Sequence, residues 1–169
     1  MSDTSHVGVT ASELVGGWRY LNWDITYDDG RLTHPFGSDA VGFILYTADG
    51  CMSANIMAGG RTAFPEGNPR RASDAERASA FDGYFSYAGR WRLEGGKVLH
   101  DVTVALNPAF VGVRQWRDPV LMRDAGGILT LSLSAVENLP GGRRMHRILW
   151  ERVEASSITD NRSFSSDRA

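Results

Sequence analysis

Short segments in which apolar and polar residues alternate run through most of the chain, and turn-forming residues separate them. A period of two is typical of β-strands that are buried on one face. The alternation predicts eight strands, at residues 16–27, 40–48, 51–57, 85–94, 97–107, 113–125, 128–137 and 143–153. Because most of the links are short and rich in glycine, consecutive strands should pair as hairpins in a sandwich or a barrel.

Four of the links are short enough to fix how their strands pair. They carry Asp49-Gly50, Gly95-Gly96, Gly126-Gly127 and Gly141-Gly142, which accept the positive φ of two-residue hairpin loops. The second of these loops sets Trp91 opposite His100. The other three loops also set apolar residues opposite one another. The expected pairs are Phe43 with Ile56 and Leu45 with Ala54 in the first hairpin, Val120 with Leu133 and Met122 with Leu131 in the third, and Leu133 with Trp150 and Ala135 with Ile148 in the fourth. The hairpins agree on one apolar face, which predicts an all-β fold: an eight-stranded antiparallel up-and-down β-barrel.

One link is much longer than the others and covers residues 58–84. It opens with glycine, arginine and proline and ends in a predicted helix, which starts at a capping box formed by Ser73 and Glu76. The links at 28–39 and 108–112 are also long, and they lie at the same end of an up-and-down barrel. We therefore expect this end to be the open mouth, with the helix as a lid over it.

The first strand does not show one clear apolar face. Trp18 and Tyr20 lie on one side of it, whereas Leu21 and Trp23 lie on the other. Two explanations remain open at this point. Either a β-bulge switches the phase within the strand, or the outer side packs on the C-terminal tail or on a partner protomer, which makes a homodimer a further expectation.

The composition indicates one ordinary globular domain with two short flanking segments. The chain has 169 residues, of which 42% are hydrophobic and 22% charged, and its net charge is -2. Without a run of Lys or Arg, neither nucleic acid nor a membrane is expected as a partner. We divide the chain into an N-terminal extension at 1–13, a barrel domain at 14–153 and a flexible tail at 154–169. The start of the chain lacks a signal-peptide pattern and Cys51 is the single cysteine, so a cytoplasmic location is expected.

Several segments carry a resemblance to a known family. Gly16-Gly17-Trp18 opens the first strand and matches the Gly-x-Trp signature of lipocalins. The segments 14–19, 34–37, 46–50, 81–84, 86–89 and 149–153 are similar to the bacterial and fungal lipocalin-like domain family. The resemblance implies a calyx for hydrophobic molecules, with Trp18 as a plug at the closed end and Arg152 packed against it. It implies no set of catalytic residues.

The inward face of the predicted barrel supplies the candidate ligand site. A concave, mostly apolar surface with few polar groups is typical of small-molecule binding. The expected ligand-binding residues are Phe43, Leu45, Ile56, Tyr84, Trp91, Val102, Val104, Asn107, Phe110, Trp116, Leu131 and Leu133. Trp116 belongs to this face only if its strand keeps its phase past Pro119, because proline inside a strand often marks a bulge.

Four polar side chains on the same face are the candidate catalytic groups. Glu137 is expected opposite His146 near the mouth, as a carboxylate–imidazole pair able to act as a general base. Tyr87 could donate a hydrogen bond to a ligand, and His100 lies deeper in the barrel. Each group also has a purely structural explanation, as a solvated rim pair, a core tyrosine or a buried histidine with satisfied hydrogen bonds.

The sequence contains no motif for a metal or a cofactor. His6, His34, His100 and His146 share no ligand spacing, and no phosphate-binding or nucleophile motif is present. Two functions therefore remain open. One is a cofactor-free isomerase, cyclase or dehydratase of secondary metabolism, in which the barrel orients a small hydrophobic substrate. The other is a non-catalytic intracellular carrier of a hydrophobic ligand.

Overall fold

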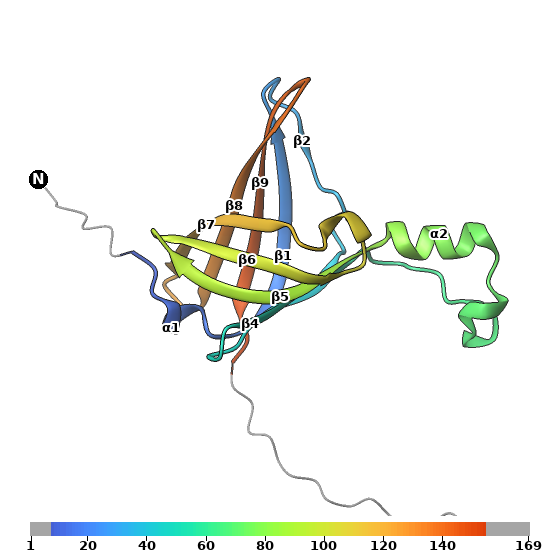
Figure 1. The fold of residues 1–169 in the computed structure, drawn as a ribbon, viewed down its shortest axis with the longest axis horizontal. Helices are drawn as coiled ribbons and strands as arrows, with labels where there is room; N and C mark the ends of the chain where they lie inside the picture. Colours follow the sequence, from blue (N-terminus) through green and yellow to red (C-terminus); the bar gives the residue numbers. More distant parts are fainter. Residues whose placement is uncertain (1–7, 155–169) are drawn as a thin grey trace, which may run out of the picture.

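The computed structural model describes residues 8–154, which form a closed antiparallel barrel (Figure 1). The strand order is β2-β1-β3-β4-β5-β6-β7-β8-β9, and an additional pairing of β1 with β9 closes the sheet. The predicted eight-stranded barrel is confirmed, with β2 as an extra short strand. The strands are β1 (Gly16–Tyr27), β2 (Leu32–Thr33), β3 (Val41–Tyr46), β4 (Cys51–Met57), β5 (Tyr84–Glu94), β6 (Lys97–Ala105), β7 (Arg114–Arg123), β8 (Leu129–Leu139) and β9 (Gly142–Arg152).

The segments outside the strands are short helices. They are α1 (Ala11–Leu14), α2 (Asp74–Asp82) and the 3-10 turns η1 (Pro65–Gly67), η2 (Pro69–Arg71) and η3 (Pro108–Phe110). No helix among residues 8–154 is long and apolar enough to cross a membrane. The predicted flexible tail lies outside the described residues, apart from residue 154.

The hairpin around Gly95-Gly96 has the predicted register, with Trp91 opposite His100. The hairpin between β8 and β9 keeps the predicted faces but is shifted by two residues along the strands. Its loop is Pro140-Gly141 rather than Gly141-Gly142, so Leu133 pairs with Ile148 instead of Trp150. Because side chains alternate with a period of two, this shift leaves every inward residue inward.

The predicted register between β3 and β4 is wrong by one residue. The loop contains three residues rather than two and ends at Gly50, whose φ of 83° is the left-handed conformation that closes such loops. Ile44 therefore pairs with Ala54 and points inward. Phe43 and Leu45 lie on the outside of the barrel, 49% and 46% exposed, so their assignment to the ligand site is wrong.

The same error affects the hairpin between β7 and β8. Its loop also holds three residues and ends at Gly127, with φ of 86°. Leu121, rather than Met122, pairs with Leu131. The alternation along β7 consequently places Trp116 on its outer side, 40% exposed, together with Val120 at 42%. No bulge occurs at Pro119, where the pairing is continuous.

Two bulges change the phase of other strands. In β1 the register shifts between Tyr20 and Asn22, so Leu21 is expelled to the surface and Trp23 turns inward. The bulge explanation for this strand is therefore confirmed. A second shift, between β5 and β6 at Gly89, turns Val104 outward. Val104 is 65% exposed, and its assignment to the ligand site is wrong.

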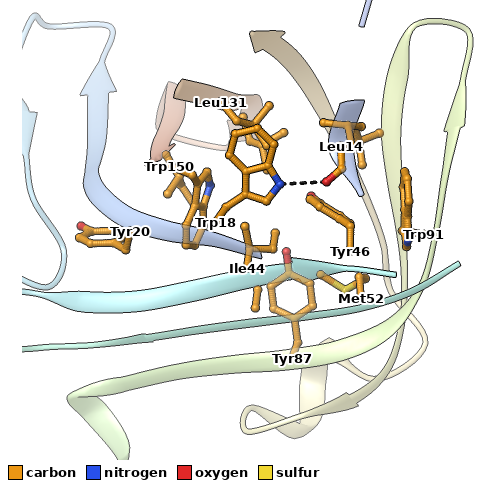
Figure 2. Close-up of a cluster of buried hydrophobic side chains, with 14 of the residues drawn as sticks. Leu14, Trp18, Tyr20, Ile44, Tyr46, Met52, Tyr87, Trp91, Leu131 and Trp150 are labelled. Atoms are coloured by element: carbon orange, nitrogen blue, oxygen red, sulfur yellow. Dashed lines mark hydrogen bonds between the residues drawn. The ribbon is translucent and has the colours of Figure 1, made fainter. Parts of the chain in front are cut away.

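The closed end of the barrel is filled by large side chains around Trp18 (Figure 2). The Trp18 indole is fully buried and donates a hydrogen bond of 2.9 Å to the carbonyl oxygen of Leu14. The Arg152 guanidinium lies over its ring, 4.1 Å from the centroid, as the resemblance implied. Trp150 and Leu131 pack beside it. The half of the barrel next to Trp18, called the lower half below, is thus a solid core and not a calyx.

The predicted helix is present, but it does not cover the barrel. Ser73 caps α2 and accepts a hydrogen bond from the Glu76 backbone, while the Glu76 carboxylate accepts one from the Ser73 backbone. No residue of α2 is buried. Figure 1 shows α2 projecting to the side of the barrel. Because α2 has no strong apolar face, the expected role as a lid is not seen in this structure.

The neighbouring residues Phe43 and Ile44 provide a test of the corrected register. Ile44 is 1% exposed inside the barrel, so Ile44→Ser should lower the free energy of unfolding by about 2–5 kcal/mol, because it leaves a cavity and a buried hydroxyl. Phe43→Ser should lower it by less than about 1 kcal/mol. Urea unfolding followed by tryptophan fluorescence measures both. A larger loss for Phe43→Ser would mean that the predicted two-residue loop was right.

Candidate functional site

The main cavity lies in the upper half of the barrel and has a volume of ≈ 480 Å³. It exists because β7 divides its pairing between two neighbours. The first part of β7 pairs with β6 from Arg114 to Arg117, and the rest pairs with β8 from Asp118 to Arg123. The upper part of β8 is therefore left without a partner on that side. The lining residues are Trp23, Phe85, Tyr87, Phe110, Arg114, Gln115, Trp116, Arg117, Leu133, Ala135, Val136, Glu137, Arg144, His146 and Ile148.

One wall of the cavity is aromatic. The ring centroids of Trp23 and Phe85 are 5.3 Å apart, and those of Phe85 and Phe110 are 5.7 Å apart in an edge-to-face arrangement. Leu133 and Ile148 line the same cavity. The wall combines the bulge in β1, which turns Trp23 inward, with η3, which carries Phe110. Such a surface favours a flat, apolar molecule.

The predicted pair of Glu137 and His146 forms at the rim of this cavity. The Trp23 indole donates to Nδ1 of His146 at 3.3 Å, and His146 Nε2 lies 3.0 Å from Oε2 of Glu137. Because an indole N–H can only donate, the His146 proton must sit on Nε2, which donates to the carboxylate. Glu137 also accepts from Arg144 Nε at 2.7 Å. Its direct partner across the strands is Arg144, not His146.

Two pKa shifts describe the charges of this rim pair. The hydrogen bond from Arg144 holds the pKa of Glu137 below its usual value, so its carboxylate is ionised. Burial lowers the pKa of His146, although Glu137 partly opposes this, so the imidazole is neutral. Both nitrogen atoms of His146 are already engaged. His146 therefore orients Glu137 and has no free lone pair with which to act as a base in this state.

A buried chain of three polar groups lies beneath the cavity. His100 is fully buried, with Nε2 at 2.8 Å from the Tyr46 hydroxyl and Nδ1 at 2.9 Å from the Tyr87 hydroxyl. Burial, helped by the Arg117 guanidinium, lowers the pKa of His100 to about 3. Only Tyr87 of the three lines the cavity. His100 is thus a neutral bridge between two tyrosines and makes no contact with the space where a ligand would lie.

The structure brings together six of the predicted site residues. Tyr87, Phe110, Trp116, Leu133, Glu137 and His146 all line the main cavity. Ile56, Trp91, Val102 and Leu131 are buried in the core below it. Tyr84 and Asn107 line a separate pocket of ≈ 200 Å³ beside α2, which they share with Phe110. Trp116 lines the cavity although it lies on the outer side of β7 and is 40% exposed.

The sequence reasoning missed most of the polar lining. Arg117 and Gln115 were placed outside because the β7 register was shifted by one residue. Trp23 was hidden by the bulge in β1. Phe85 and Ile148 lay on the inward face of the predicted strands and could have been included. Among residues 8–154, no group of three or more His, Cys, Asp and Glu side chains could hold a metal ion.

Comparison with known proteins agrees with this geometry. The model of the lipocalin-like domain family matches residues 15–153, a range that contains every strand of the barrel. A search of curated proteins found no match.

The buried His100 should make stability depend on pH. Its pKa is about 3 in the folded protein and about 6.5 when unfolded, so the unfolded state binds more protons between these values. The free energy of unfolding should therefore fall by about 2–3 kcal/mol from pH of about 7 to about 4.5. Urea unfolding at each pH measures this loss. His100→Gln keeps polar contacts to the tyrosines and should flatten the dependence; an equal slope in both proteins would contradict the assignment.

Proposed function

Because the chain belongs to the lipocalin-like domain family, we propose that it binds one small, largely apolar organic molecule in the cavity between β7 and β8. The observation that carries the proposal is the cavity itself. Its volume of ≈ 480 Å³ is within the usual range of small-molecule sites, and an aromatic wall faces a few polar groups across it. The filled core below sets the depth to which a ligand can enter.

Binding without turnover is the function that the polar groups support best. A general base needs a free lone pair, whereas both nitrogen atoms of His146 are engaged. Glu137 is held by Arg144, which lowers its pKa and weakens it as a base. In this proposal the protein is a cytoplasmic carrier, and a homodimer stays a prediction.

A second candidate is a cofactor-free isomerase, cyclase or dehydratase. The observation that favours it is that an acid and a base line the same cavity. The Tyr87 hydroxyl could polarise a carbonyl of the substrate, while the carboxylate of Glu137 removes a proton from carbon. His100 would then act only through Tyr87, as a positioning residue. The aromatic wall would hold the substrate in its reactive shape.

Filling the cavity should abolish ligand binding. Ala135 lines the cavity, so Ala135→Trp should weaken the binding of the neutral fluorescent probe N-phenylnaphthylamine by at least about tenfold, since a ligand and the new indole would compete for the same space. Fluorescence titration measures the affinity. The matched control is Val120→Trp on the outer face of β7, which should leave the affinity unchanged. Equal affinities in both variants would place the probe outside the cavity and refute the proposal.

Incorporation of deuterium at carbon in the ligand distinguishes a carrier from an enzyme. The molecule that co-purifies with the protein would be identified by mass spectrometry and then incubated with fresh protein in deuterium oxide. A carrier should return it unlabelled. An enzyme that removes a proton from carbon should introduce deuterium, and both Glu137→Gln and Tyr87→Phe should prevent the labelling while the ligand still binds. Labelling that survives both substitutions would exclude these residues as the acid and the base.

A further inference from the structure

The charges that line the cavity do not balance. Three arginines, Arg114, Arg117 and Arg144, face a single carboxylate, Glu137. Two of the three have a carboxylate partner: Arg114 Nε lies 3.0 Å from Asp101, and Arg144 Nε lies 2.7 Å from Glu137. Arg117 forms no ion pair with any residue in the described range 8–154. One positive charge in the cavity is therefore left without an anion.

The hydrogen bonds of Arg117 leave much of its guanidinium free. Nη1 donates to the Trp116 carbonyl oxygen at 3.0 Å, and Nη2 donates to Oε1 of Gln115 at 3.0 Å. Both acceptors are neutral. A guanidinium carries five N–H donors in a flat fork, so further donors remain for a planar anion. The side chain is half-buried, which strengthens its interactions compared with an arginine in water.

Arg117 shares the cavity with titratable groups of the site. Burial raises the pKa of Tyr87 and lowers the pKa values of His100 and His146, and the Arg117 guanidinium makes a smaller, lowering contribution to each of the three. Arg117 and Tyr87 line the same cavity, and Tyr87 joins it to the buried polar chain below. The aromatic wall faces the same space.

The buried polar chain can supply a second donor at the same place. Neutral His100 has one N–H and one lone pair, so it accepts from one tyrosine and donates to the other. When Tyr46 donates to Nε2, the proton on Nδ1 is donated to the Tyr87 oxygen. The hydroxyl proton of Tyr87 is then free to point into the cavity. An anion beside Arg117 would favour this direction of the chain.

We propose that Arg117 and Tyr87 form an anion subsite, which binds the carboxylate of a flat, apolar carboxylic acid. The inference rests on the proposed function and names the class of its ligand. The guanidinium contributes two parallel hydrogen bonds to the carboxylate, and Tyr87 contributes a third. Trp23, Phe85 and Phe110 contact the apolar body of the acid. The ligand anion supplies the partner that Arg117 lacks.

The test compares naphthoate with its neutral methyl ester, using calorimetry on the full chain. Wild-type protein should bind the acid at least about tenfold more tightly than the ester, since charge-assisted hydrogen bonds are lost in the ester. Arg117→Met should remove this preference by weakening only the acid. Tyr87→Phe should weaken the acid by about three- to tenfold. Arg19→Met, which removes an exposed arginine on the outer side of β1, is the matched control and should change neither affinity.

The outcomes separate the two proposals. If the ester binds wild-type protein as tightly as the acid, or if Arg117→Met weakens both equally, the cavity binds apolar molecules but the anion subsite is refuted. If neither compound binds, the proposed function and the subsite fail together. Should Arg117→Met not fold, the preference of the wild type for the acid and its reduction in Tyr87→Phe still decide the question.

Discussion

The pairing of β1 with β9 is the interaction on which the rest of the structure depends. It joins the two ends of the sheet and runs from Trp18 opposite Arg152 to Tyr27 opposite Arg144. At its lower end the Trp18 ring and the Arg152 guanidinium meet over the closed end of the barrel. The buried indole also ties α1 to the barrel through the carbonyl of Leu14. In a closed barrel, large side chains can be buried only in the interior, and here they fill its lower half.

The cavity is what remains where this packing stops. Strand β7 pairs with β6 up to Arg117 and with β8 only from Asp118 onward, so the barrel wall opens beside the upper part of β8. The bulge in β1 turns Trp23 toward the same space, and η3 brings Phe110 to it. The site thus depends on irregular backbone built on a regular barrel. Hydrogen bonds also link the cavity to the core, because Tyr87 lines the cavity and is joined to His100, which is joined to Tyr46.

The sequence by itself determined the fold. Period-two alternation, glycine-rich turns and the Gly-x-Trp segment predicted a barrel, and each of these is a local feature of the chain. The Gly95-Gly96 hairpin was predicted to the residue because its loop has two residues with positive φ. Arg152 was matched to Trp18 through the family resemblance. Tyr87 and Leu133 point inward as predicted, because the one-residue register errors beside them changed the faces of β7 and of the end of β6 instead.

Only the tertiary structure decided which side chains reach the ligand space. A loop of three residues instead of two, as at Gly50, reverses the faces of a whole strand, and this moved Phe43 and Leu45 outside. The broken alternation of β1 indicated a bulge only as one of two explanations, and the bulge that turns Val104 outward leaves no mark in the pattern, because bulges depend on how neighbouring strands coil together. In the sequence, nothing distinguishes Arg117 from an exposed charged residue. Its burial beside Tyr87 and its missing partner arise from contacts between strands that are far apart along the chain.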